Sequence, residues 1–210
     1  MWGKRVAAHA RSTRSIKQCV NLGIEVIYHA SFADEEALDM LEASKKSHFI
    51  APGLAWLINT CHNASEFGIT PAVARQMGYF RGLEAAIETM RALRKRDVRI
   101  LPGGDYGFAW TPHGTNAKDL EYFVKYVGMS TMEALLSATA WGAPMMKLRD
   151  QLGKIQDGYL ADLLLVDGDP LADITVLQDK NRILAVMKDG EFHRAPPMRA
   201  TARTATRWAA

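Results

Sequence analysis

Residues 21–30 read Asn-Leu-Gly-Ile-Glu-Val-Ile-Tyr-His-Ala, and this stretch decides the fold class. Gly23 ends a run with helical periodicity that begins near Ser12, and the apolar run from Ile24 then leads to His29. A helical pattern that stops at glycine and passes at once into a short strand is typical of βα repeats. The same alternation continues to about residue 142, which predicts βα units on a parallel sheet.

Four strand-like runs set the expected order of this sheet. They cover Lys4–His9, Ile24–His29, His48–Leu54 and Val98–Pro102. Each is short, rich in apolar residues and bounded by turn-forming or helical segments.

Helical patterns follow these strand-like runs. They begin at Ser12, at the N-cap Asp34, at the N-cap Thr70 and at the N-cap Ser130. After Thr70, Pro71 occupies the first helical position, and apolar residues recur at spacings of three and four as far as Leu93. This pattern predicts one long amphipathic helix, preceded by a long connection from the third strand. Ser130 and Glu133 form a capping box for the last helix.

The sequence pattern changes at about Leu152, where turn-forming residues begin to separate short apolar runs. Asp189-Gly190 joins Ile183–Met187 to Glu191–His193, which predicts a β-hairpin. We therefore expect a βα domain over residues 1–151, a β-rich segment over residues 152–193 and a disordered basic tail over residues 194–210.

The composition is that of a soluble globular protein, with 48% hydrophobic and 23% charged residues in 210. The net charge of +3 comes from four arginines in the acid-free tail, so we expect no nucleic-acid binding. No apolar run approaches the ~18 residues of a membrane span, and no secretory signal is visible, so we expect a cytoplasmic protein without membrane contact. Cys19 and Cys61 are expected to be buried free thiols.

Three strand-like runs lead to a residue that can bind a metal: His9, His29 and Asp105. Reactive groups in parallel βα folds collect at the carboxyl ends of strands, where the variable loops meet. Two imidazoles and a carboxylate are also the ligands of catalytic zinc sites that keep one position open for water. Each residue taken singly could instead be structural, and spacing does not decide between these readings.

Several segments resemble the metal-dependent amidohydrolase superfamily. The resemblance is carried by residues 6–10, 21–30, 101–107, 128–139, 152–166 and 186–190. Its most specific part is Gly158-Tyr159-Leu160-Ala161-Asp162-Leu163 with the preceding Gly153-Lys154-Ile155. It extends over nearly the whole chain to about His193.

This resemblance implies the later strands, five to eight, of a (β/α)8 TIM-type barrel in residues 1–151, followed by a β-sandwich portion in residues 152–193. It implies that His9, His29 and Asp105 bind one or two divalent metal ions, zinc first among them. Asp105 and His29 would be catalytic, with Asp105 as the base. His113 is a candidate for substrate or outer-shell contact. Tyr28 is a second such candidate, although barrel packing also explains it. No other cofactor is implied.

The chain departs from the family because the His-x-His pair of the first strand and the carbamylated lysine of the fourth have no counterpart. A complete barrel takes ~250 residues, and four βα units supply half of one. We therefore expect a truncated or split chain that self-associates or needs a partner for the missing half, and that binds metal weakly alone. The expected activity is hydrolysis of non-peptide amide, amidine or related ester bonds in a small molecule. The alternative is a non-catalytic remnant or assembly module, and the chain alone is expected to be inactive.

Overall fold

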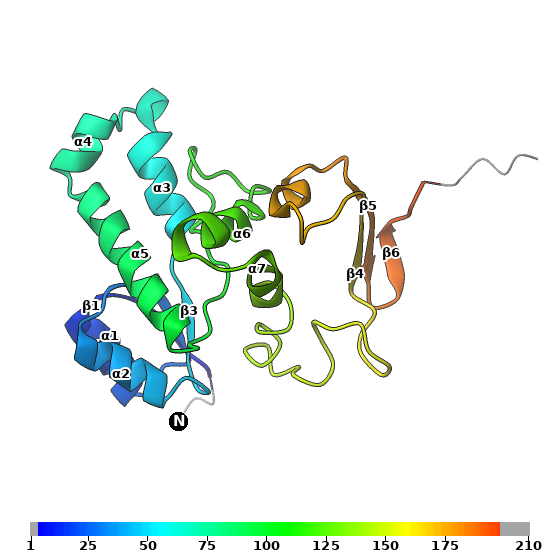
Figure 1. Ribbon diagram of the computed structural model, residues 1–210, viewed down its shortest axis with the longest axis horizontal. Coiled ribbons are helices and arrows are strands. Elements are labelled where there is room, and N and C mark those ends of the chain that lie inside the picture. The colour runs from blue at the N-terminus through cyan, green and yellow to red at the C-terminus, as the bar shows by residue number, and fades with distance from the viewer. Residues whose placement is uncertain (1–3, 198–210) are drawn as a thin grey trace, which may run out of the picture.

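The computed structural model describes residues 4–197, and a parallel sheet organises its first half (Figure 1). This sheet consists of β1 (Ala7–Ser12), β2 (Val26–Phe32) and β3 (Phe49–Ala51), in that order. The strands are connected by α1 (Thr13–Asn21) and α2 (Glu35–Ala43). The connections from β1 to β2 and from β2 to β3 each join parallel strands through a helix, so both are βα units, as the sequence predicts.

β1 and β2 run three residues beyond His9 and His29, so the expectation that each histidine ends its strand was wrong. Pairing continues past a register shift to Ser12, which lies opposite Phe32. β1 stops there because the Ser12 hydroxyl accepts a hydrogen bond from the Ser15 backbone N–H and caps α1. The histidines lie in the carboxyl halves of their strands.

The fourth expected strand, Val98–Pro102, is reduced to one parallel bridge between Ile50 and Ile100. The backbone N–H of Leu101 donates to the Ile50 carbonyl at 2.8 Å. Few residues of β3 can pair, because Pro52 has no backbone N–H and Gly53, with a φ of 68°, turns the chain into the next helix. The sheet therefore has three regular strands and a bridged fourth segment.

Helices follow β3 where the sequence predicts a long connection. They are α3 (Leu54–His62), the 3-10 helix η1 (Ser65–Phe67), α4 (Pro71–Gln76) and α5 (Tyr79–Lys95). α3 is buried over most of its length, and its continuous apolar run has no amphipathic period to reveal it. The single long helix expected after Thr70 is broken, because Gly78 takes the left-handed conformation between α4 and α5.

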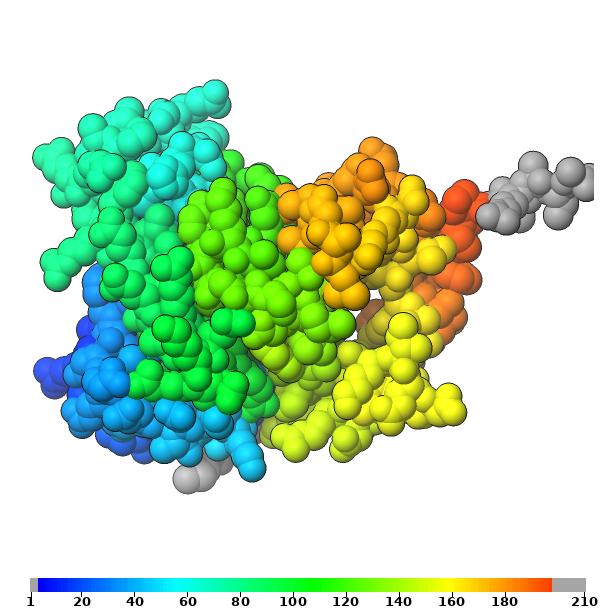
Figure 2. Space-filling view, in the orientation of Figure 1, coloured from blue at the N-terminus to red at the C-terminus, as the bar shows by residue number. Residues whose placement is uncertain are grey.

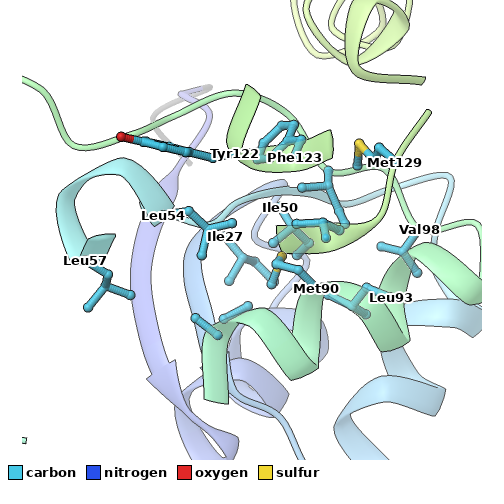
Figure 3. Packing of buried hydrophobic residues seen from close by; sticks show 14 of the residues in the cluster. Ile27, Ile50, Leu54, Leu57, Met90, Leu93, Val98, Tyr122, Phe123 and Met129 are labelled. Atoms are coloured by element: carbon cyan, nitrogen blue, oxygen red, sulfur yellow. The ribbon is translucent and has the colours of Figure 1, made fainter. Parts of the chain in front are cut away.

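The core lies between the parallel sheet and α5 (Figure 3). Ile27 from β2 and Ile50 from β3 are fully buried, and Met90 and Leu93 of α5 pack over them. Phe123 reaches the same cluster from the later half of the chain. This core holds α5 against the sheet.

The next helical elements in the chain are α6 (Lys118–Tyr122), the π-helix η2 (Phe123–Val127) and α7 (Thr131–Ser137). The predicted capping box is confirmed: the Ser130 N–H donates to Glu133 Oε2 at 2.7 Å, and the Glu133 N–H donates to Ser130 Oγ at 3.2 Å. Arg94 at the end of α5 donates two hydrogen bonds to the same carboxylate. Glu133 therefore ties α7 to α5.

The C-terminal part is a separate antiparallel sheet at the far end of the molecule (Figures 1 and 2). Its elements are β4 (Leu163–Val166), the 3-10 helix η3 (Ile174–Gln178), β5 (Ile183–Lys188) and β6 (Glu191–Arg194), with sheet order β4-β5-β6. The hairpin at Asp189-Gly190 is confirmed.

This sheet stands alone within residues 4–197, so a sandwich is not formed by the described part of the chain. The consecutive residues Leu164 and Leu165 of β4 point to opposite faces, and both are more than half exposed. β6 extends to Arg194, the first residue of the predicted tail, and most of that tail lies outside the described residues. None of the helices in residues 4–197 combines the length and hydropathy needed to cross a bilayer.

Candidate functional site

His9 and His29 meet on the parallel sheet. Parallel pairing of β1 with β2 sets Ala10 beside His29, and the two imidazole rings lie 4.8 Å apart between centroids. Nδ1 of His9 and Nε2 of His29 are separated by 2.7 Å, which is a hydrogen-bond distance. His9 is exposed, whereas His29 is buried. The structure therefore brings together two of the three residues that the sequence offers as candidate ligands.

The backbone at His29 is strained. His29 has a φ of 75° and Ala30 a φ of 47°, both in the left-handed region that residues with a Cβ rarely adopt. Each such residue costs about 1–3 kcal/mol and persists only when its surroundings hold it. Burial, followed by the nearby Arg11 guanidinium, lowers the pKa of His29. The ring is therefore neutral at pH 7 and able to act as a ligand or hydrogen-bonding group.

Asp105 approaches from the bridged segment. Its Oδ2 lies 4.0 Å from Nε2 of His29, and its side chain is 37% exposed. Asp105 also has a positive φ, 60°, which aspartate tolerates better than most residues. Hydrogen bonds from the N–H groups of Gly53 and Trp56 to the carbonyls of Gly103 and Gly104 hold the backbone that precedes it.

Asp119 is a buried carboxylate that the sequence prediction missed. Its Oδ2 accepts a hydrogen bond from the Gly103 N–H at 2.9 Å, two residues before Asp105. Within residues 4–197, its Oδ1 has no hydrogen-bond partner. Burial raises its pKa to about 6. One pattern in the sequence could have indicated its burial: Asp119 lies four residues before Phe123, on the apolar side of a short helix.

The two weaker candidates lie near these groups. Tyr28 is opposite His9 in the register, with ring centroids 5.3 Å apart. His113 follows the turn after Asp105, and its Nε2 would lie 3.2 Å from a Cβ placed on Gly107. Tyr28 therefore contacts the site directly, and His113 borders the loop that leaves it.

The side chains at this site, two imidazoles and a carboxylate, match a divalent metal in donor chemistry. Their spacing is that of a hydrogen-bonded pair, because two nitrogens on one tetrahedral zinc ion lie about 3.3 Å apart. Within the described part of the chain, no group of three His, Cys, Asp or Glu side chains is arranged to hold a metal. The rings of His9 and His29 would have to separate slightly to share an ion.

The fold and this rim define a class of protein. Consecutive parallel βα units with imidazole and carboxylate groups at the carboxyl side of the sheet fit part of a βα barrel. Residues 1–192 match the amidohydrolase family, and the chain belongs to that family.

Similar proteins support this assignment. A solved Xaa-Pro dipeptidase with bound methionine in its active site is 30% identical, with a TM-score of 0.78, over 92% of this chain and 46% of that one. A solved prolidase complexed with N-methylphosphonate-L-proline is 27% identical, with a TM-score of 0.78, over 91% of this chain and 45% of the other. The ochratoxinase of Aspergillus niger is 26% identical over 91% of this chain and 38% of its own length. The chain spans less than half the length of each of these relatives.

Proposed function

We propose that this chain carries part of the active site of a metal-dependent hydrolase that cleaves carbon–nitrogen or related ester bonds in a small molecule in the cytoplasm. The observation that carries the proposal is the approach of His9, His29 and Asp105, with 2.7 Å between the imidazoles and 4.0 Å from His29 to the carboxylate. Family membership and the bound amino acid of the dipeptidase relative support the same reading.

His9, His29 and Asp105 would hold a divalent ion, with zinc the first choice for this donor set. The chemistry that such an ion supplies is a water nucleophile at neutral pH, since it lowers the pKa of water to about 7. The Asp105 carboxylate takes the proton of the attacking water and passes it to the leaving nitrogen or oxygen. Its partly exposed position lets a substrate reach it, and neutral His29 keeps a lone pair available.

We propose that a second polypeptide segment, from a partner or a second copy, completes the site. Within residues 4–197, β1 forms one edge of its sheet, and β3 pairs with β2 on one side and is bridged to Ile100 on the other. Unpaired strand edges of a parallel sheet are normally closed or covered. Leu164 and Leu165 of β4 are exposed, which supports a second segment packing on the C-terminal sheet as well.

Zinc titration and hydrolysis assays on the full chain test this proposal. We expect weak zinc binding that His9→Ala abolishes, and zinc-dependent cleavage of amide or ester chromogens that Asp105→Asn abolishes once the completing segment is present. Asp157→Asn, at an exposed carboxylate in the C-terminal half, is the matched control and should change neither.

The second candidate is a non-catalytic remnant. The hydrogen bond between His9 and His29 favours it, because one nitrogen must carry the proton that the other accepts and so cannot bind a metal. A folded chain that binds no zinc, alone or with the completing segment, would support the remnant and refute the enzyme.

A further inference from the structure

The strained end of β2 lies where the strand ladder is interrupted. β1 pairs with His29 and again with Phe32, and the register shifts between these two pairs. Within residues 4–197, the ladder therefore gives Ala30 and Ser31 no partner in β1, although both are fully buried. His29 and Ala30 also have positive φ values, which persist only where the surroundings impose them. Contacts outside the ladder must hold this segment.

Thr89 of α5 supplies such a contact. Its hydroxyl donates a hydrogen bond to the Ser31 carbonyl at 3.0 Å. The Ala33 N–H donates to the same hydroxyl at 3.5 Å. Thr89 is itself buried, and α5 packs on the sheet through the core shown in Figure 3. One side chain of α5 therefore holds the backbone on both sides of Phe32.

Two consecutive peptide units are fixed in this way. The Ser31 carbonyl belongs to the peptide unit that joins Ser31 to Phe32, and the Ala33 N–H belongs to the next one. The carbonyl of this second unit, that of Phe32, accepts a hydrogen bond from Thr13 Oγ1 at 2.6 Å. Because peptide units are planar, a bond to either group restrains the orientation of the whole unit. Only the torsions of Ser31 and Ala30 separate these held units from His29.

The requirements of α5 alone do not explain a hydroxyl at position 89. The other buried residues of this helix are glycine or apolar: Gly82, Leu83, Ala86, Met90 and Leu93. A buried hydroxyl costs free energy unless it forms a hydrogen bond. Threonine in a helix often donates to a carbonyl of the preceding turn, whereas Thr89 donates across to β2. The hydroxyl therefore serves the strand.

We propose that Thr89 is a positioning residue, whose hydroxyl keeps the His29 ring at hydrogen-bond distance from His9. This inference rests on the proposed function, because His29 is a candidate ligand there. The two ring nitrogens are 2.7 Å apart, and His29 reaches this place with a left-handed backbone. Functional side chains need to be held within about 0.5 Å and 10–20° of their working geometry. Release of the Ser31 peptide unit lets the strain at Ala30 relax, and the ring then moves away from His9.

NMR of the full chain without added metal tests the inference. In the wild type we expect a slowly exchanging ring proton between Nδ1 of His9 and Nε2 of His29, with scalar coupling between the two nitrogens across the hydrogen bond. Thr89→Val keeps the shape of the side chain and removes the hydroxyl. It should abolish the coupling and make the ring proton exchange about 10-fold faster.

Thr89→Ser is the rescue variant, because it retains the hydroxyl and should keep the coupling. Ser137→Ala is the matched control: Ser137 is also buried in a helix, and its hydroxyl donates to the Ala134 carbonyl at 2.7 Å. This control should leave the ring proton unchanged. If Thr89→Val does not fold, Thr89→Cys carries the test, since a thiol of similar size is a weak donor and should speed the exchange several-fold.

Four results would overturn the inference. These are a wild-type chain without the slowly exchanging ring proton, Thr89→Val (or Thr89→Cys in its place) that keeps the wild-type exchange rate, Thr89→Ser that loses the coupling, and Ser137→Ala that also loses it. Failure of the proposed function would look different: the ring proton would depend on Thr89, yet the chain would bind no zinc, alone or with the completing segment.

Discussion

The backbone of Gly53 lies against the buried edge of His29. A Cβ at position 53 would stand 2.9 Å from Nδ1 of the imidazole and 3.9 Å from Oδ2 of Asp105. Glycine is required there twice, once for this contact and once for the φ of 68° that begins α3. A side chain at position 53 would therefore press on His29, whereas it would meet Asp105 at an ordinary contact distance.

Gly53→Ala should displace the His29 ring and destabilise the fold by about 2–3 kcal/mol, because left-handed strain and a steric clash add. The measurement is urea denaturation, together with zinc titration of the folded protein. We expect zinc binding to be lost at denaturant-free conditions where the variant is still folded.

Gly78→Ala is the matched control for this change. Gly78 precedes α5 with a φ of 79°, but nothing lies within 4 Å of a Cβ placed there. Its cost should be the backbone strain alone, about 1 kcal/mol, with zinc binding unchanged. Equal losses in both variants would show that the contact with His29 has no effect.

Asp119 should make the protein less stable as the pH rises. Burial raises its pKa from 3.8 to about 6, so the folded state holds the proton more tightly than the unfolded chain. The protonated Asp119 carboxyl contributes about 3 kcal/mol to the free energy of unfolding. This stabilisation is fully present below pH 4 and is lost as the pH rises through 6. Asp119→Asn keeps an acceptor for the Gly103 N–H and removes the charge.

We therefore expect the free energy of unfolding of Asp119→Asn, relative to wild type, to increase between pH 4 and pH 7. Denaturation at a series of pH values measures it. Asp119→Ala, which leaves the Gly103 N–H without its acceptor, should instead be less stable at every pH. A difference between Asp119→Asn and wild type that does not change with pH would contradict the raised pKa.

Glu133 should have the opposite dependence. Its pKa is lowered to about 2, chiefly by the hydrogen bonds from Arg94, so its contribution is present above pH 4.5 and is lost as the pH falls through 2. Glu133→Gln should cost about 1–2 kcal/mol at pH 7, because it weakens both the capping box and the link to α5. Glu191→Gln, at an exposed position of β6, should be neutral in the same denaturation experiment.

The exposed sheets should make the purified chain associate. Among residues 4–197, no strand pairs with the outer edge of β1, and Leu164 and Leu165 of β4 present apolar side chains to solvent. Size-exclusion chromatography with light scattering should give dimers or larger species, and Leu164→Lys should reduce them. A stable monomer that unfolds cooperatively would refute this expectation.

Local signals in the sequence predict much of this fold. The βα order, the Ser130–Glu133 capping box and the Asp189-Gly190 hairpin depend on residues close in sequence, and all three are present. α3 was not predicted because its burial on all sides removes the amphipathic period. The break at Gly78 was missed because the apolar spacing continues across it.

The site was predictable only in part. Periodicity and family resemblance point to His9, His29 and Asp105, but the spacing between their atoms depends on the strain at His29 and on the packing of Gly53. Asp119 contacts Gly103 and Arg11 contacts Trp56, and both partners lie far away in the sequence. No local pattern contains such pairs. The expected sandwich remains a prediction.

The order of the strands has a consequence for how the protein folds during synthesis. β1 pairs with β2 and β2 with β3, so partners lie about 20 residues apart in the chain and each is the next strand to be made. β1 and β2, which carry the two histidines, are therefore both translated before Gly53 and Asp105, the residues that complete the surroundings of His29. Asp105 follows the segment that is bridged at Ile50–Ile100, so it is the last of the three candidate ligands to be made.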